Sequence, residues 1–211
     1  MNLASSRTFL KTLDYMKPAG QAGKATLKAI LNSKGDLKEI KSLNVSAKDL
    51  DLKNGTLVFK SKGDEVYPAR GSFDSVDIGK TQGVFNFEMD ASKAMKIIIR
   101  ASRFDLRPVL ASGAKKDEAK TEKQSPPVTI SLSADQMLTT DEGSVTAAKA
   151  YVEIDGTDKI QRMEFDARTT TGAGQGDIYL RYKPDPQTGE RTFRLEADDA
   201  GAALKAFDLY D

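Results

Sequence analysis

Short stretches in which apolar and polar residues alternate recur along most of the chain. In residues 24–31 the odd positions are Ala, Leu, Ala and Leu, and the even positions are Lys, Thr, Lys and Ile. Successive side chains of a β-strand point to opposite faces, so this period of two predicts a half-buried strand. The pattern predicts about eleven strands in all, with further examples at 43–47, 57–59, 85–89, 95–101, 128–134, 145–154, 163–167, 178–182 and 193–197.

Short segments rich in Gly, Asn and Asp separate these strands. Such residues are typical of tight turns, some of which need a positive φ. We expect neighbouring strands to pair antiparallel through turns at Ser33–Asp36, Lys53–Gly55, Lys62–Asp64 and Ile78–Lys80, with a Pro-Gly connection at Pro184–Glu190.

Helical spacing occurs at both ends of the chain. Residues 5–16 place Phe9, Leu10 and Leu13 on one helical face, and Pro18 with Gly20 would end that helix. Near the other end, Asp198 or Asp199 can cap a helix over 200–207. The expected fold is mainly β, an antiparallel sheet with a short helix at each end. Residues 104–110 break the strand pattern and predict a compact turn or a single helical turn.

A change of composition divides the chain. Residues 114–127 consist mostly of Lys, Glu, Ala and Pro, with almost nothing to bury. The expected organisation is an N-terminal helix and lead-in at 1–19, an antiparallel β half at 20–111, a flexible charged linker loop at 112–127, and a second antiparallel β half at 128–211 that ends in the short helix. The pattern leaves open whether the two halves form one sheet or two.

Composition excludes several functional classes. The formal net charge is +1, which provides no long-range field for nucleic acid, so no nucleic-acid partner is expected. Histidine and cysteine are both absent, which removes the usual bases and nucleophiles of hydrolases and the thiolate ligands of zinc. No apolar run approaches the roughly 18 residues of a membrane helix. The N-terminus does not resemble a signal peptide, so a targeting segment of an exported parent would lie outside this chain.

The remaining candidates for chemistry are weak. Ser112 and Lys115 have the spacing of a serine–lysine pair but lie in the expected linker, and the Gly-rich segment 172–176 precedes a strand where a phosphate loop would precede a helix. The Asp clusters at 49–51 and 74–77 lack the alternating ligands of a calcium loop. We expect no catalytic residue, no metal, no cofactor and no enzymatic activity, although a carboxylate-based hydrolase stays open as an unsupported alternative.

The apolar strand positions allow two interpretations. They can be the closed core of a sandwich or barrel, or a surface that stays partly open and receives acyl chains. The period of two does not choose between them.

Four segments carry a resemblance to a known family. They are 13–20 (LDYMKPAG), 40–45 (IKSLNV), 104–110 (FDLRPVL) and the closing 197–211 (ADDAGAALKAFDLYD). In content and order they resemble the C-terminal region of AsmA-like envelope proteins of the YhdP type. In that family the last segment leads into a further Gly-rich strand, so this chain would be a fragment of a longer protein.

The resemblance implies a long, curved antiparallel sheet folded into a β-groove, or taco-like trough. It also implies a periplasmic location in an inner-membrane-anchored parent, whose anchor and adjacent segments lie outside this chain. The implied function is phospholipid binding and lipid transport between the inner and outer membranes during outer membrane biogenesis. The alternative is a non-enzymatic structural or protein-interaction scaffold with a closed core. From alternation we assign these lipid-groove candidates: Leu27, Leu43, Val45, Leu57, Phe59, Phe85, Phe87, Ile97 and Ile99.

Overall fold

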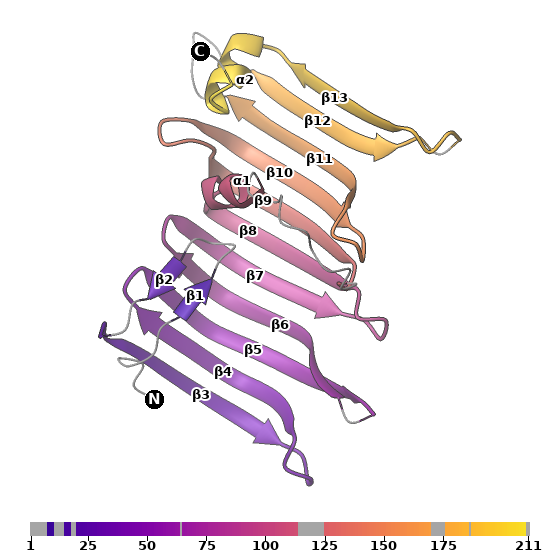
Figure 1. The fold of residues 1–211 in the computed structure, drawn as a ribbon. Helices are drawn as coiled ribbons and strands as arrows, with labels where there is room; N and C mark the ends of the chain where they lie inside the picture. The colour runs from indigo at the N-terminus through magenta and orange to yellow at the C-terminus, as the bar shows by residue number, and fades with distance from the viewer. Residues whose placement is uncertain are drawn as a thin grey trace.

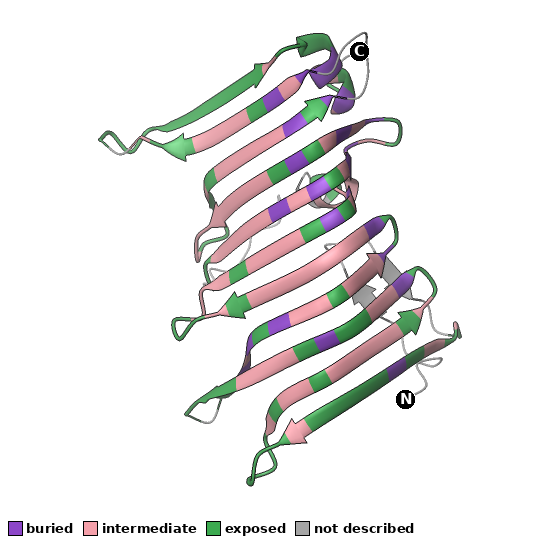
Figure 2. Cartoon of the chain, turned by 180° about the vertical axis from the view of Figure 1, so that it is seen from behind, coloured by how far each residue is buried: buried purple, intermediate pink, exposed green. Residues whose placement is uncertain are grey.

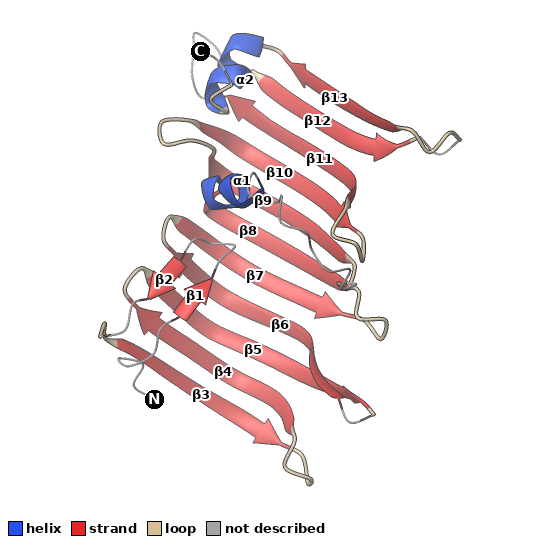
Figure 3. Cartoon of the chain, in the orientation of Figure 1, coloured by secondary structure: helices blue, strands red, loops and turns tan. Residues whose placement is uncertain are grey.

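The chain forms one long, open, curved β-sheet (Figures 1 and 3). The structure is a computed structural model, and it describes residues 8–10, 15–17, 20–63, 65–113, 125–169, 176–185 and 187–209. The sheet has eleven strands in the order β13-β12-β11-β10-β9-β8-β7-β6-β5-β4-β3, so each strand in it pairs with its neighbour in sequence. The prediction of a mainly β, antiparallel architecture is confirmed.

The strands of this sheet run across it with connections at both margins. Their bounds are β3 Gly23–Leu31, β4 Leu37–Ala47, β5 Leu50–Lys62, β6 Glu65–Ile78, β7 Thr81–Met89, β8 Met95–Asp105, β9 Val128–Leu138, β10 Ser144–Ile154, β11 Ile160–Thr169, β12 Asp177–Pro184 and β13 Arg191–Ala197. We call the margin that holds the β3–β4, β7–β8, β10–β11 and β12–β13 turns the hairpin margin, and the opposite one the helical margin.

One parallel pair joins the two halves of the chain. Strands β8 and β9 run in the same direction, from the Met95–Val128 pair to the Asp105–Leu138 pair, and every other pair in the sheet is antiparallel. A parallel connection must return the chain to the margin where the first strand began. Helix α1 (Arg107–Gly113) begins that return, and the Met95 N–H bonds to the Pro127 carbonyl at 2.8 Å where it ends. The two halves therefore form a single sheet.

The expected linker is only partly described. Its first two residues, 112 and 113, belong to the end of α1, and 114–124 lie outside the described residues. At its end, the Ser125 N–H donates to the Gly156 carbonyl at 2.9 Å. The helical turn predicted at 104–110 is present as the start of α1.

The N-terminal helix prediction is wrong where the structure describes that segment. Two short strands, β1 (Thr8–Leu10) and β2 (Tyr15–Lys17), pair antiparallel there in a small second sheet. A helix of about a dozen residues is marginal without packing. Thr8, Phe9 and Tyr15 are residue types that favour strands, so local preference opposes the helical spacing.

The turn predicted at Lys53–Gly55 is also wrong. These residues lie inside β5, and the chain reverses between β4 and β5 at Lys48–Asp49, where Asp49 has φ +55°. Asn54 adopts φ +52° as part of a β-bulge, and its N–H donates to the Asn44 side-chain oxygen at 2.9 Å. The positive φ that an Asn-Gly pair favours is thus used to kink a strand.

The densest packing lies at the helical margin of the C-terminal half. Ala203 and Ala206 of helix α2 (Ala200–Ala206) share one buried cluster with alanines of β8 to β11 and with Met137, Val145 and Ile178. This helix confirms the one expected at 200–207. The outermost strands are far more open, and Figure 2 shows β13 almost entirely exposed.

Candidate functional site: the apolar face

Side chains that lie opposite each other on paired strands point to the same face of a sheet. Followed through the pairings, two rows of mostly apolar residues cross all eleven strands. The first row is Leu27, Leu43, Gly55, Phe73, Phe85, Ile99, Leu132, Ala150, Phe165, Leu180 and Leu195. In this row Gly55 and Phe73 are linked by direct contact, and the other neighbours are paired residues of adjacent strands. The second row is Ala29, Ile40, Leu57, Gly71, Phe87, Ile97, Ile130, Val152, Met163, Tyr182 and Phe193. We call the surface that carries both rows the apolar face.

The structure brings the nine predicted groove residues onto this face. Seven of the nine belong to the two rows. Val45 lies in a third, shorter row between Ala25 and Leu52. Phe59 follows Leu57 by alternation, although a bulge shifts its partner to Pro68.

Most residues of the apolar face are neither buried nor fully exposed. The aromatic and aliphatic side chains of its middle strands are half-buried. Exposure increases toward both edges of the sheet, reaching 59% for Leu27 on β3 and 62% for Phe193 on β13. A closed sandwich would bury such residues almost completely, so the described residues do not seal this face.

Three phenylalanines form an aromatic cluster at the middle of the face. The ring centroids of Phe73 and Phe85 are 6.3 Å apart, and those of Phe85 and Phe87 are 6.2 Å apart. Two of the rings lie against glycines, since a Cβ on Gly55 would be 2.6 Å from Phe73 and one on Gly71 would be 2.3 Å from Phe87. Sequence reasoning missed Phe73 and both glycines, because a glycine interrupts the apolar alternation that was used to find the face.

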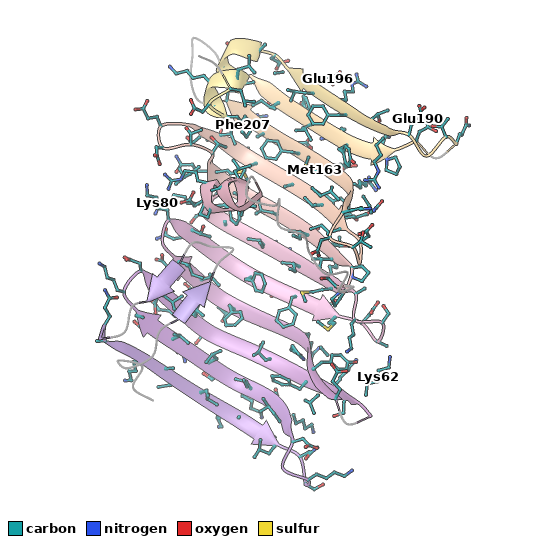
Figure 4. All side chains as sticks on the ribbon, viewed as in Figure 1. Lys62, Lys80, Met163, Glu190, Glu196 and Phe207 are labelled. Atoms are coloured by element: carbon teal, nitrogen blue, oxygen red, sulfur yellow. The ribbon has the colours of Figure 1, made fainter. Side chains whose placement is uncertain are left out.

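Helix α2 and the residue after it cover the helical margin of the face over the C-terminal strands. Phe207, which follows α2, meets the Phe165 ring edge-on at a centroid distance of 6.1 Å. Figure 4 shows Phe207 near that margin and Met163 nearer the middle of the face. The buried Thr139 hydroxyl donates to the Ala206 carbonyl and fastens the end of α2 to the sheet.

The opposite face is polar and rich in ion pairs. Arg162 binds Glu164, and Arg181 binds Asp166, with Arg162 also lying 5.3 Å from the Tyr151 ring centroid. These ion pairs, one within β11 and one between β11 and β12, keep this surface hydrated and compatible with the sheet. The sheet is therefore amphipathic across its whole width.

The acidic residues considered at the sequence level are scattered among cationic and polar partners. Asp51 pairs with Lys53 at 2.8 Å, which raises the pKa of the Lys53 amine through a hydrogen bond and charge attraction. Asp77 accepts from the Gln82 amide at 3.0 Å. The Ser112 side chain and Lys115, like residues 172–175, lie outside the described residues.

Comparisons with protein-family models, with curated proteins and with solved structures found no match to this chain. Within the described part of the chain, neither helix has the length and apolar character needed to cross a bilayer. The apolar face and the sequence resemblance are therefore the observations from which a function can be argued.

Proposed function

We propose that this chain is the lipid-binding segment of an AsmA-like periplasmic protein, in which the apolar face holds phospholipid acyl chains during transport between the inner and outer membranes. It performs no catalysis in this proposal. The observation that carries it is the pair of apolar rows that cross all eleven strands, with most of their large side chains half-buried or exposed.

The energetics favour an apolar ligand on this face. Each Å² of apolar surface removed from water contributes about 25 cal/mol, so a hydrocarbon chain lying across several half-buried side chains gains several kcal/mol. The rows have no polar interruption before Tyr182, which means that neighbouring positions have similar affinity. A bound acyl chain can then move along the face without crossing a large energy barrier, as lipid transport requires.

Site-specific photocrosslinking tests the proposal with a matched control in the same strand. The photoreactive residue p-benzoylphenylalanine would replace Leu27 or Phe193, which are exposed on the apolar face, or their neighbours Thr26 and Arg194, which are exposed on the polar face. The proteins are expressed in the periplasm of a bacterium, irradiated in cells and analysed by mass spectrometry for phospholipid adducts.

Phospholipid adducts at Leu27 and Phe193, and none at Thr26 and Arg194, are the expected result. Crosslinks from Leu27 and Phe193 to protein alone, with no lipid extracted from the purified chain by organic solvent, would instead favour the interaction scaffold. Equal lipid crosslinking from both faces would also contradict the proposal, because it would report unspecific membrane contact.

A further inference from the structure

Arg191 lies on the apolar face. Arg191 begins β13 and pairs with Pro184, two residues from Phe193, so it occupies the hairpin margin of that face. Its guanidinium reaches across two strands: Nη1 donates to the Ile160 carbonyl at 2.6 Å and to the Tyr182 hydroxyl at 2.9 Å, and Nη2 donates to the Gln161 side-chain oxygen at 2.9 Å. It also lies 5.8 Å from the Tyr182 ring centroid.

All of these acceptors are neutral. Among the described residues no ion pair joins Arg191 to a carboxylate, unlike Arg162, Arg181 and Arg194 on the polar face. Gln161 in turn donates its side-chain amide N–H to the Asp155 carboxylate. A guanidinium has five N–H donors, so these three bonds leave the Nε–H and one Nη2–H available. Arg191 is thus held in position while keeping its charge and two donors for an anion.

An apolar track leads from Arg191 toward the helical margin. Phe193 is 62% exposed and Leu195 is 49% exposed, and they follow Arg191 at alternate positions on the same face. The track ends in a cleft of about 580 Å³ between α2 and the last two strands, whose apolar lining includes Leu195, Leu204, Phe207 and Leu209. Six strand residues span about 20 Å, which is on the scale of a fatty acyl chain.

We propose that Arg191 binds the phosphate of a single-chain or diacyl phospholipid whose tail follows Phe193 and Leu195 into the cleft beneath α2. This inference rests on the proposed function and adds to it a headgroup site and a fixed orientation. The lipid lies along β13, with its phosphate at the hairpin margin and its chain end at the helical margin.

Calorimetry with two amphiphiles of equal chain length separates the contribution of the headgroup to binding from that of the tail. Dodecyl phosphate and dodecyl maltoside, each below its micelle concentration, would be titrated into the wild-type chain and the R191Q, R191K and R194Q variants. R194Q is the matched control, because Arg194 lies on the other face of the same strand and pairs with Glu196. Inorganic phosphate alone is the third ligand.

We expect R191Q to weaken dodecyl phosphate binding by at least about tenfold, the scale of one charge-assisted hydrogen bond. R191K should retain part of the affinity, R194Q should bind as wild type, and maltoside binding should be equal in all four proteins. If R191Q does not fold, added NaCl should still weaken dodecyl phosphate binding to the wild-type chain while leaving maltoside binding unchanged.

The outcomes that contradict the proposed function differ from those that contradict the Arg191 assignment. Absence of binding by both amphiphiles would contradict the proposed function itself. Maltoside binding together with an equal affinity of R191Q and wild type for dodecyl phosphate would overturn only the Arg191 assignment. Inorganic phosphate that binds as tightly as dodecyl phosphate in an Arg191-dependent way would identify a site for a free anion and overturn the headgroup assignment.

A spin-labelled lipid tests the orientation. Lysophosphatidylcholine with a nitroxide at its chain end should broaden the NMR signals of Leu204 and Leu209 more than those of Arg191 and Thr192. The reverse order of broadening would overturn the proposed direction of the chain.

Discussion

Three hairpin turns share the same pattern of side-chain-to-backbone hydrogen bonds. At Asn32, Asp90 and Asp155 a side-chain oxygen accepts from the backbone N–H groups two and four residues later. The residue three positions later has a positive φ in each case, +88° for Gly35, +68° for Lys93 and +59° for Asp158. Only in the first of these loops is the residue of positive φ a glycine. The side-chain acceptor fixes the turn in the other two.

Asp155 makes stability depend on pH in the acidic range. Its carboxylate accepts from the Thr157 hydroxyl and from the Lys159 and Thr157 N–H groups, which lowers the pKa of Asp155 to about 2. A folded pKa below the unfolded value of about 3.9 stabilises the fold above pH 4, and that contribution is lost as the pH falls from about 4 to about 2. We expect the urea midpoint of the wild-type chain to fall over this interval.

The Asp155→Asn variant isolates this effect, because asparagine keeps an acceptor for the turn but does not titrate. Between pH 4 and pH 2 its urea midpoint should fall less than that of the wild type. Asp90 and Asp185, whose pKa values are also lowered by local hydrogen bonds, still titrate in both proteins. An equal fall of the urea midpoint in the two proteins between pH 4 and pH 2 would contradict the assignment to Asp155.

Ala147 carries backbone strain inside β10. Its φ is +50° at the bulge where the β10–β11 register shifts, and its side chain is exposed. A left-handed residue costs about 1–2 kcal/mol, more than the roughly 0.5–1 kcal/mol of extra chain entropy that glycine loses on folding. Ala147→Gly should therefore stabilise the chain by about 0.5 kcal/mol in urea unfolding. Ala147→Val should destabilise it, and an A147G variant less stable than wild type would show that the strain is not relieved.

At the scale of the elements, glycine and phenylalanine pack as partners across β5, β6 and β7. Gly71 has no room for a Cβ beside Phe87 and Leu57. Gly71→Ala should cost about 1–3 kcal/mol, the usual penalty of overpacking, although alanine is otherwise the better strand residue.

A double-mutant cycle checks the cause of that cost. In a Phe87→Ala background the added methyl group meets less resistance, so Gly71→Ala should cost clearly less there. Urea unfolding of the four proteins measures the coupling. Equal costs in the two backgrounds would show that ring contact is not what requires glycine at this position.

Helix α2 depends on its N-cap more than a longer helix would. Seven residues cannot sustain a helix alone, and the Asp199 side chain accepts from the Ala202 N–H at 2.9 Å. Asp199→Ala should cost about 1 kcal/mol in thermal or urea unfolding, whereas Asp199→Asn should cost little because it keeps the acceptor. Since α2 forms one wall of the cleft, Asp199→Ala should also weaken amphiphile binding.

At the scale of the whole molecule, an open sheet of eleven strands has an uneven distribution of stability. The main buried cluster draws on β8 to β12 and α2, while β13 is almost wholly exposed and β3 buries little beyond Ala25. Native-state hydrogen exchange should show the strongest amide protection in β9 and β10 and the weakest in β3 and β13. Equal protection from edge to edge would indicate that another chain segment or a second copy covers the edges.

The alternation of residues predicted ten of the eleven strands of the large sheet and a common face for most of their apolar side chains, but it did not predict β6. Alternation is a local property, because neighbouring side chains on an extended backbone must point in opposite directions. The same reasoning predicted the nine groove candidates, which the structure places on one face. It failed at residues 5–16 and 53–55, where a helical spacing and an Asn-Gly pair each fit more than one backbone conformation.

Only the tertiary structure decided what those faces meet. The parallel β8–β9 pair that unites the halves, the glycines beneath Phe73 and Phe87, and the neutral partners of Arg191 all join residues far apart in the chain. Alternation reports which side a residue takes but contains no information about what lies opposite it. That depends on register and on strand order, which are set by contacts between strands rather than within them.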